Sequence, residues 1–320
     1  MIQDTSSKIR NVSSLVEHYS ELRVQRCGVD GILPAEFFPT YQWLRPNDWT
    51  RCYQVIDDVA FVFKKVRIYS AQFNRLEGLP ISLTGDRTTE LRVTQDLFSS
   101  GWIHKVRCCQ LESDALECMG FSKLQKEAAV ANFWYDTAKK ARRTQMSSWR
   151  PRSVLNWALK NGTLTWGPAS ASDFPGVSDL FQSWIRKKEI EKQAVMYKEL
   201  YQSILDKLSR HSDKLNISVL SWNSKPIALV VHLISGGCAH LLANVNVSNT
   251  AEDFGVPEKL RPYVGSIIPF FSSKSFVEQG VRTAFLGYCE ENDPLIKYKR
   301  SLAVGETKLS VVEISDKPLE

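Results

Sequence analysis

The stretch that decides the fold runs from Leu215 to Val247 and reads LNISVLSW-NSKP-IALVVHLIS-GG-CAHLLANVNV. It holds three apolar runs rich in β-branched residues, at Leu215–Trp222, Ile227–Ile234 and Cys238–Val247. Only the turn-forming residues 223–226 and the pair Gly236-Gly237 separate these runs. Because connections this short join antiparallel neighbours, the stretch predicts a three-stranded antiparallel meander.

Helices and further strands surround this meander in the C-terminal half of the chain. Upstream we expect a strand at Gly162–Trp166, a helix that starts at Asp173-Phe174-Pro175, and an amphipathic helix over Met196–Leu208. Downstream we expect a helical region at Pro257–Gln279, a strand at Arg282–Gly287, a helix at Pro294–Leu302 and a strand at Lys308–Ile314. Pro262 and Pro269 must start, kink or split the first of these helices. The order β-α-α-β-β-β-α-β-α-β predicts an α/β (α+β) fold, a mixed sheet flanked by helices.

The N-terminal half shows a shorter version of the same order. We expect a helix at Val12–Arg23, strands at Cys52–Ile56 and Val59–Val66 around the Asp57-Asp58 turn, a helix at Thr88–Ser99, a strand at Trp102–Cys108 and a helix at Ser122–Ala131. The chain is therefore predicted to contain two halves of one kind in tandem. The predicted divisions are 1–135, a basic linker helix at 136–161, and a C-terminal domain at 162–320.

Composition narrows the class of protein. With 320 residues, 43% of them apolar and 24% charged, the chain can bury the cores of two domains. No apolar run approaches the ~20 residues that span a bilayer, and Met1–Arg10 lacks the apolar core of a signal peptide. The expected location is the cytoplasm, or the host cytoplasm for a phage-encoded protein. The chain has seven cysteines, an odd number with no CxxC pair, so a disulfide framework is not expected. Its five histidines do not combine with cysteines at zinc-ligand spacing, so a metal site is not expected either.

The strongest charge asymmetry lies between the halves, where Thr137–Ser172 contains no acidic residue. Its cations include Lys139, Lys140, Arg142, Arg143, Arg150, Arg152 and Lys160, and Trp149 and Trp157 lie among them. One interpretation is a nucleic-acid surface, in which cations contact phosphates and the tryptophans stack on bases. The other is a solvated helical face with its tryptophans in the core. The net charge of +6 mildly favours an anionic partner.

Two short motifs, added to the strand order, give a resemblance to a known superfamily. One is Phe133-Trp134-Tyr135-Asp136 followed by the basic run that ends in Arg152–Asn156, and the other is Phe285–Tyr288 followed by Leu295–Arg300. The order resembles the core of the GNAT superfamily of N-acetyltransferases. The motifs resemble the soluble part of lysyl-phosphatidylglycerol synthetases and, more distantly, Fem-type peptidyl-transferases, whose opening is similar to Phe37–Ile68 with Trp43.

The resemblance implies an acyltransferase that moves an acyl or aminoacyl group from acyl-CoA or aminoacyl-tRNA to an amine or hydroxyl. A nucleic-acid substrate, either the tRNA or a modified DNA base, fits the basic segment. The alternative is a nucleic-acid-binding protein that keeps the fold without the chemistry.

One departure concerns the donor. GNAT acetyltransferases carry an R/Q-x-x-G-x-G/A loop whose backbone N–H groups cradle the pyrophosphate of coenzyme A. The corresponding stretch here is Asn246–Tyr263, in which Gly255 is the only glycine. Acetyl-CoA is therefore in doubt as the donor, whereas an enzyme that uses aminoacyl-tRNA would not need the loop.

The resemblance also places the reaction where the fourth and fifth core strands part, at Ala243–Val247 and Leu286–Glu290. The donor would lie along Ala243, Asn244, Val245 and Asn246. Acid candidates are Tyr288 and Tyr298, and base candidates are Glu290 and His240, with His232, Glu291 and Asp293 also weighed. The other interpretations are buried tyrosines, structural histidines, a solvated loop and, for Asp293, a helix N-cap. Lys297, Lys299 and Arg300 would hold a phosphate or complement the dipole of the last helix. The oligomeric state is not predicted.

Overall fold

The computed structural model describes residues 12–33, 51–68, 71–121, 124–142, 144, 146, 149–190, 215–235, 237–290, 293 and 295–314. Contacts divide the chain into two compact units. Unit 1 contains the residues up to Asn132 together with Tyr288–Ile296 and the residues from Glu306 onward. Unit 2 contains Phe133–Gly287 and Lys297–Gly305. The predicted division at 135/136 and 161/162 stays a prediction.

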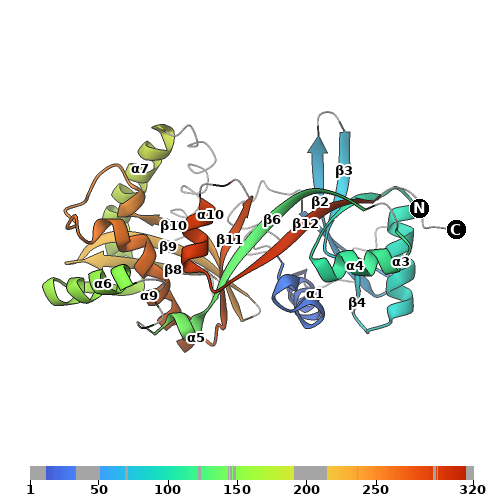
Figure 1. Cartoon of the computed structure of the whole chain (residues 1–320), viewed down its shortest axis with the longest axis horizontal. Coiled ribbons are helices and arrows are strands. Elements are labelled where there is room, and N and C mark those ends of the chain that lie inside the picture. The colour runs from blue at the N-terminus through green and yellow to red at the C-terminus, as the bar shows by residue number, and fades with distance from the viewer. Residues whose placement is uncertain are drawn as a thin grey trace. The chain divides into compact units, whose positions relative to one another are not determined.

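Unit 1 is built on a mixed sheet whose described strand order is β1-β2-β3-β5-β12. Its elements are α1 (Val12–Cys27), η2 (Gly28–Gly31), β1 (Arg51–Ile56), β2 (Val59–Ile68), β3 (Ala71–Glu77), β4 (Ile81–Ser82), α3 (Arg87–Ser99), β5 (Ile103–Cys108), α4 (Gln110–Cys118) and β6 (Leu124–Asp136), of which β6 reaches into unit 2 (Figure 1). β1, β2 and β3 form an antiparallel meander, and β5 then pairs parallel to β3. The crossover between these parallel strands contains α3, which packs Val93, Leu97 and Phe98 into the core.

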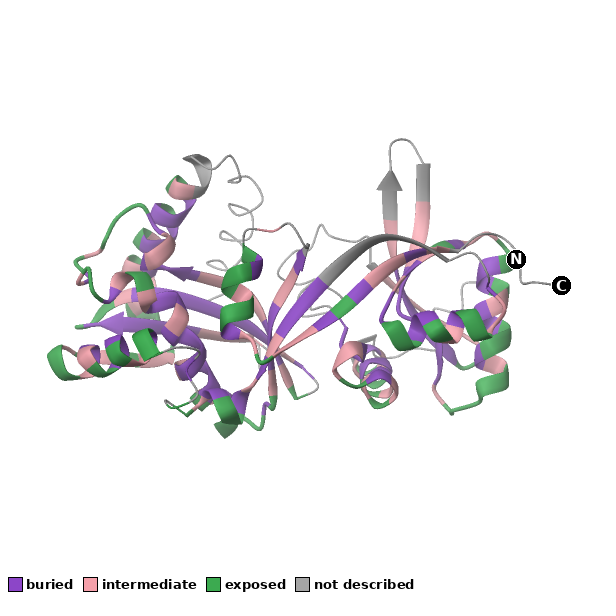
Figure 2. Ribbon diagram, viewed as in Figure 1, coloured by how far each residue is buried: buried purple, intermediate pink, exposed green. Residues whose placement is uncertain are grey.

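Unit 2 repeats this connectivity with longer strands, in the order β11-β10-β9-β8-β7. Its elements are α5 (Thr137–Lys140), α6 (Trp149–Asn161), β7 (Leu164–Pro168), η5 (Ala171–Asp173), α7 (Phe174–Ile190), β8 (Leu215–Trp222), β9 (Lys225–Ser235), β10 (Cys238–Asn246), η6 (Val247–Asn249), η7 (Arg261–Tyr263), α9 (Val264–Glu278), most of β11 (Thr283–Glu290) and most of α10 (Leu295–Leu302). The last strand of the chain, β12 (Gly305–Ile314), belongs to unit 1 from Glu306 onward. The predicted meander is confirmed as β8, β9 and β10. Asn223 and Ser224 both have positive φ, as the tight hairpin turn requires. β9 is buried along most of its length (Figure 2), which explains why the residues of Ile227–Ile234 are apolar on both faces, with His232 as the exception.

The tandem arrangement of two GNAT-like halves is therefore present in the connectivity. Each half has a three-stranded meander, a helix, a strand parallel to the third one, another helix and a final strand. The final strands are exchanged. β12 ends the second half in sequence but pairs with β5 in unit 1, with Ser310 opposite Cys108. The last residues of β6, Phe133–Asp136, belong to unit 2.

Some predicted elements differ from the structure. Ser122–Ala131 was expected to be helical, but β6 covers Leu124–Asp136. Pairing with neighbouring strands outweighs the helix-favouring residues of this segment. The predicted helix Pro257–Gln279 is shorter, because α9 begins at Val264, after the 3₁₀ turn that contains Pro262. The stripe Met196–Leu208 and Trp43 lie outside the described residues.

Candidate active site

The parallel strands β10 and β11 pair only at their beginnings. Cys238–His240 pair with Thr283–Phe285, and no further pair joins the described residues of the two strands. Both strands lose regular geometry just after this point. β10 has an irregularity between Leu241 and Ala243, and Gly287 in β11 has a φ of +82°. Because a bulge bends its strand, these features explain why the strands part where the resemblance places the reaction.

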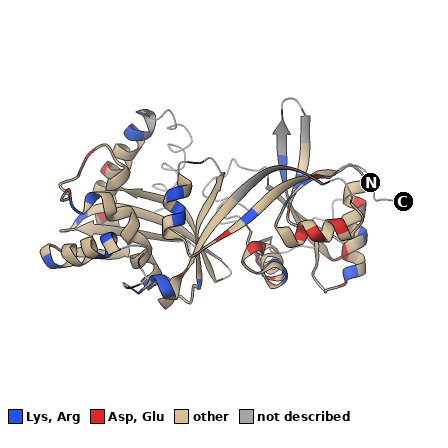
Figure 3. Ribbon diagram, in the orientation of Figure 1, with Lys and Arg blue, Asp and Glu red and all other residues tan. Residues whose placement is uncertain are grey.

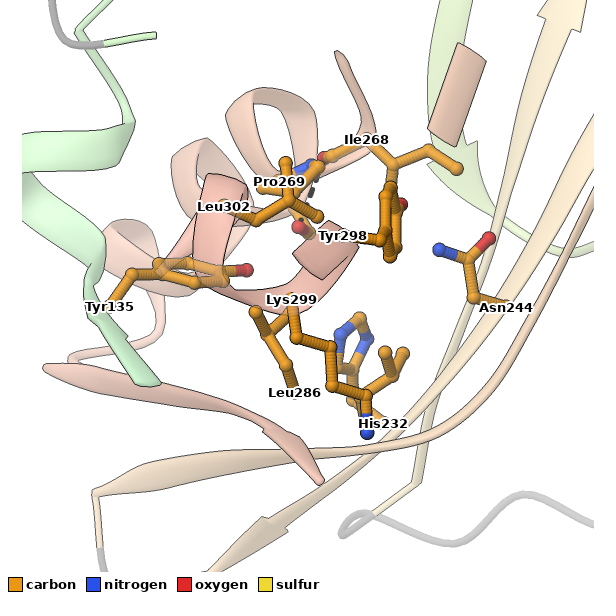
Figure 4. A pocket seen from close by; sticks show the side chains of 11 residues that line it. Tyr135, His232, Asn244, Ile268, Pro269, Leu286, Tyr298, Lys299 and Leu302 are labelled. Atoms are coloured by element: carbon orange, nitrogen blue, oxygen red, sulfur yellow. Dashed lines mark hydrogen bonds between the residues drawn. The ribbon is translucent and has the colours of Figure 1, made fainter. Parts of the chain in front are cut away.

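A cavity lies where the strands part, entirely within unit 2, and we call it the splay cavity. Its empty space is about 340 Å³, open solvent at its mouth included. Strands β6, β9, β10 and β11 and helices α9 and α10 supply its lining (Figure 4). The lining residues are Tyr135, His232, Leu241, Asn244, Ile268, Pro269, Ser272, Leu286, Tyr298, Lys299 and Leu302.

Tyr298, predicted as an acid, lines this cavity from α10. Its hydroxyl donates a hydrogen bond of 2.9 Å to the carbonyl of Gly265 on α9. That carbonyl would normally accept the N–H of the residue four positions later, which is Pro269 and has no N–H. Removal from water, and the nearby Tyr135, raise the pKa of Tyr298 above its usual value, although the residue as a whole is 36% exposed. The phenol therefore stays protonated at neutral pH.

His232 lies on β9 and faces the splay cavity. It is 3% exposed, and its ring packs edge-on against Phe276 at 4.8 Å between centroids. Its Nδ1 is buried and has no hydrogen-bond partner in the described part of the chain. Burial, and secondarily His240, lower the pKa of His232 to about 3, so the ring is neutral.

His240, predicted as a base, lies on the opposite face of the sheet. In the β9–β10 register His232 is opposite Leu241, whereas His240 is opposite Leu233, so the two rings point to different sides. His240 stacks on Phe285 at 5.4 Å, and burial lowers its pKa to about 4. It does not line the splay cavity.

The predicted donor-binding stretch divides between the two faces of β10. Asn244 is opposite Val230, and Asn246 is opposite Ala228, which places both amides on the face of His232. Asn246 Nδ2 donates to Asn244 Oδ1 at 2.8 Å, which leaves the Asn244 Nδ2 group directed toward the cavity (Figure 4). Ala243 and Val245 point to the other side, where Val245 is fully buried.

The loop after β10 uses its backbone amides internally. The N–H groups of Ala251 and Glu252 donate to Ser183 Oγ at 3.1 and 3.0 Å, and the N–H of Gly255 donates to Asp253 Oδ1 at 2.9 Å. Arg261 in turn binds the carbonyls of Val247, Thr250 and Glu252. These amides therefore form no cradle for a pyrophosphate, in agreement with the missing glycine-rich motif.

Tyr288 and Glu290 are not among the residues that line the splay cavity. Tyr288 belongs to unit 1, where its ring packs with Cys27, Cys109 and Leu309 and lies 5.8 Å from the guanidinium of Arg107. Glu290 is the last residue of β11, and its side chain, like all of Glu291, lies outside the described part. Asp293 Oδ1 accepts the N–H of Leu295 at 2.8 Å, which confirms the N-cap interpretation.

The predicted cations differ in exposure. Lys140 is buried and its Nζ donates to the carbonyl of Leu302 at 2.6 Å, at the C-terminus of α10, so it lies away from the surface. Trp149 is 65% exposed at the start of α6 and carries Arg150 5.8 Å from its ring. Lys139, Arg142, Lys297 and Arg300 are also exposed, and Arg152 is half-buried. Blue segments on α5, α6 and α10 mark the Lys and Arg positions of these helices (Figure 3). Trp157 is half-buried and stacks on Trp222. Arg143 lies outside the described residues.

The structure adds residues that the sequence did not single out. Tyr135 is buried on β6 within the Phe133–Asp136 motif, and its ring lines the splay cavity beside Ser272 of α9. Burial raises the pKa of Tyr135, and the neighbouring hydroxyls of Ser272 and Ser273 partly oppose that rise. Alternation along β6 places Phe133 and Tyr135 on one face, but no strand was predicted at these residues, so the pattern was not used. Lys299, one of the cations that the sequence did single out, also lines the splay cavity, where its Nζ donates to the carbonyl of Gly287 at 3.1 Å.

The described residues contain no helix that is long and apolar enough to cross a membrane. In the same part of the chain, no group of three or more His, Cys, Asp or Glu side chains is arranged to hold a metal ion.

The parallel strands β10 and β11 part, and a cavity lies between them. The same order of helices and strands also occurs in both halves of the chain. Together these features define the fold as GNAT-type. Comparison with solved structures agrees. A conserved protein of unknown function from Bacteroides thetaiotaomicron matches with a TM-score of 0.63 at 14% identity, over 86% of this chain and 90% of that one. The C-terminal domain of a putative lysylphosphatidylglycerol synthetase from Agrobacterium fabrum matches at 0.54 and 11%, over 92% of each chain. L-PGS from Bacillus licheniformis matches at 0.50 and 10%, over 94% and 92%. No family model and no curated protein matches the sequence.

Proposed function

We propose that the chain is a transferase that moves an acyl or aminoacyl group from an activated donor to an amine or hydroxyl acceptor. The observation that carries the proposal is the splay cavity, which lies where β10 and β11 stop pairing. In the GNAT-type fold this gap is where a thioester or ester donor reaches the acceptor. The expected cytoplasmic location belongs to the proposal.

The residues at the cavity suit two parts of acyl transfer, stabilisation of the oxyanion and protonation of the leaving group. Asn244 Nδ2 is an N–H donor directed toward the cavity, where it would stabilise the oxyanion that forms at the attacked carbonyl. Tyr298 is protonated and would donate a proton to the leaving group. His232, with a pKa of about 3, is too weak a base to deprotonate an alkylammonium group whose ordinary pKa is ~10. We therefore assign His232 a binding role and assign the removal of the acceptor's proton to a water chain.

The proposal is tested by transfer of labelled acyl groups from two donor classes, acyl-CoA thioesters and aminoacyl-tRNAs, to a panel of amines, alcohols and a DNA duplex with an aminated base. Leu286→Trp, which fills the cavity from β11, should abolish transfer. Val277→Trp, at a 46% exposed position on α9, should not. Equal activity of the two variants, or transfer from neither donor class, would refute the proposal.

A second candidate, nucleic-acid binding without chemistry, is favoured by one observation. Trp149 is exposed beside Arg150 at the start of a helix whose first turn has no acidic residue. An exposed tryptophan next to a guanidinium provides both a stacking surface and a phosphate contact. The same surface fits an enzyme that holds tRNA or DNA, so binding and transfer must be measured separately.

A further inference from the structure

The splay cavity contains two polar groups that a ligand could bind. Among the described residues His232 Nδ1 is buried without a partner, and Asn244 Nδ2 is directed toward the cavity because Asn244 Oδ1 accepts a hydrogen bond from Asn246. The two side chains come from adjacent strands and share one face of the sheet. A buried polar atom without a partner lowers stability, so a site that leaves one in place is suited to a ligand that supplies the missing hydrogen bond.

The charge and polarity of the lining indicate the kind of ligand atom. Lys299 places an ammonium group at the cavity, and Asn244 presents an N–H donor. The side chains that line the cavity, all of them among the described residues, include no carboxylate. A cationic group on the ligand would thus meet a like charge and a donor, whereas an oxygen would accept from Asn244. The neutral ring of His232 offers one N–H and one bare nitrogen, so it accepts from a hydroxyl or donates to any oxygen.

The rest of the lining is apolar and suits a short carbon chain. Leu241, Ile268, Pro269, Leu286 and Leu302 surround the polar pair. The empty space of about 340 Å³ includes open solvent at the mouth, so the enclosed part is small and suits a short chain only. An acyl group of a few carbons with one oxygen substituent would fill the apolar part and satisfy the polar one.

We propose that the splay cavity is an acyl-group pocket selective for a short acyl chain that bears a hydroxyl or other oxygen substituent, recognised by His232 and Asn244. This inference rests on the proposed transferase function and narrows its donor. It sets an oxygen-bearing acyl group apart from both a plain alkanoyl group and a cationic aminoacyl group.

The test uses three matched donor fragments that lack phosphates. They are the N-acetylcysteamine thioesters of butyric, 3-hydroxybutyric and 3-aminobutyric acid, which differ only in a hydrogen, a hydroxyl or an ammonium at one carbon. Affinity for the full chain is measured by calorimetry. We expect the hydroxy compound to bind roughly tenfold more tightly than the butyryl compound, the value of one net hydrogen bond, and the amino compound to bind most weakly.

Two variants assign the preference to its residues. His232→Phe keeps the ring against Phe276 but removes both nitrogens, and Asn244→Leu keeps the approximate volume but removes the amide. In each variant the ratio of affinities for the hydroxy and butyryl compounds should fall toward one, whatever the change in affinity for the butyryl compound itself. His104→Phe, at an exposed position on β5, is the matched control and should keep the preference. Thermal unfolding of each variant verifies that it is folded.

The outcomes separate this inference from the proposed function. Tightest binding of the amino compound would overturn the inference and support an aminoacyl donor. Equal binding of the three compounds, or an unchanged preference in both variants, would also overturn it. Binding of none of them, together with transfer from intact donors, would refute the acyl pocket while leaving the transferase in place.

Discussion

The hydroxyl of Tyr298 replaces the backbone N–H that Pro269 cannot supply to the carbonyl of Gly265. The replacement depends on residue 265 being glycine, because a Cβ there would lie 2.9 Å from the Tyr298 oxygen. One hydrogen bond therefore ties α10 to a break in the hydrogen-bond ladder of α9, beside the splay cavity. Tyr298 has a structural role whether or not it also acts as an acid.

The hydrogen bond between Tyr298 and Gly265 predicts the outcome of a double-mutant cycle at Tyr298 and Pro269. Tyr298→Phe leaves the Gly265 carbonyl without a donor and should lower the free energy of unfolding by ~1–2 kcal/mol. Pro269→Ala restores the N–H of residue 269, so the same Tyr298→Phe change should cost clearly less in that background. Urea unfolding of the four proteins gives the coupling energy.

Activity measured on the same four proteins separates the two roles of Tyr298. If the phenol protonates the leaving group, Tyr298→Phe lowers kcat in both backgrounds. If it acts only through Gly265, Pro269→Ala rescues kcat together with stability. Equal costs of unfolding in the two backgrounds would disprove the replacement itself.

The buried histidines predict a pH dependence of stability. Burial lowers the pKa of His232 to about 3 and that of His240 to about 4, below the usual ~6.5 that each has in the unfolded chain. Below pH ~6.5 the unfolded chain therefore binds protons that the folded chain does not. Stability is complete above this pH and falls, by up to ~1.4 kcal/mol per pH unit for each histidine, as the pH drops toward 4.

His232→Phe should make this acid-side slope shallower by one histidine's share between pH 4.5 and 6, as measured by urea unfolding followed by tryptophan fluorescence. His104→Phe provides the comparison, because its imidazole is exposed in the folded protein as well. A slope that His232→Phe leaves unchanged would mean that His232 is protonated in the folded chain.

The sequence predicts an element correctly where the residues of that segment alone favour one secondary structure. The apolar runs and tight turns of β8, β9 and β10 carry their own signal, and those strands lie where the pattern places them. The segment Leu124–Ala131 of β6 has no such pattern, because it is composed of residues that also favour helices. The exchange of β6 and β12 between the units has no sequence signal at all, since strand order is decided by long-range pairing.

The candidate site shows the same limit. The resemblance locates the gap between β10 and β11, and Tyr298 and Asn244 lie there. The alternation of residues in a strand would separate His232 from His240 only once the register of β9 against β10 is known. Pro269 lies four residues after Gly265, so the sequence alone shows that the Gly265 carbonyl lacks its helical N–H donor. It does not show that Tyr298, 33 positions away, supplies the replacement, because only the folded chain brings the two together.

The exposed residues of α6 predict a salt-dependent contact with nucleic acid. Trp149→Ala and Arg150→Gln should each weaken binding of a single-stranded oligonucleotide. Arg150→Gln should also reduce the slope of log affinity against log salt by about one. Lys225→Gln, an exposed cation in the β8–β9 hairpin, is the control. Filter binding at several salt concentrations measures both affinity and salt slope. If the oligonucleotide binds Trp149→Ala as tightly as the unaltered chain, the exposed face of α6 is not its binding surface.

A buried ion pair stabilises unit 1. Arg23 and Glu112 are 2% and 3% exposed, and two hydrogen bonds of 2.9 and 2.8 Å join them. Burial alone would raise the pKa of Glu112, but Arg23 and the N–H groups of Cys109 and Leu79 hold it below its usual value. Glu112→Gln should cost ~3–5 kcal/mol in unfolding free energy, because it leaves the guanidinium buried and uncompensated. Asp57→Asn, which breaks an exposed pair with Arg92, should change stability little.

The internally bonded loop between β10 and α9 predicts that coenzyme A phosphates contribute little to donor affinity. The amides of Ala251, Glu252 and Gly255 already have acceptors within the chain. In an acetyltransferase with the glycine-rich loop, such amides would bind the pyrophosphate, and removing it would weaken binding strongly. Here an acyl-CoA and the acyl-pantetheine with the same acyl group should bind within a few fold of each other. Calorimetry with the two compounds measures the ratio. A preference of a hundredfold or more for the coenzyme A form would show that another part of the chain recognises the phosphates, and would restore acyl-CoA as the expected donor.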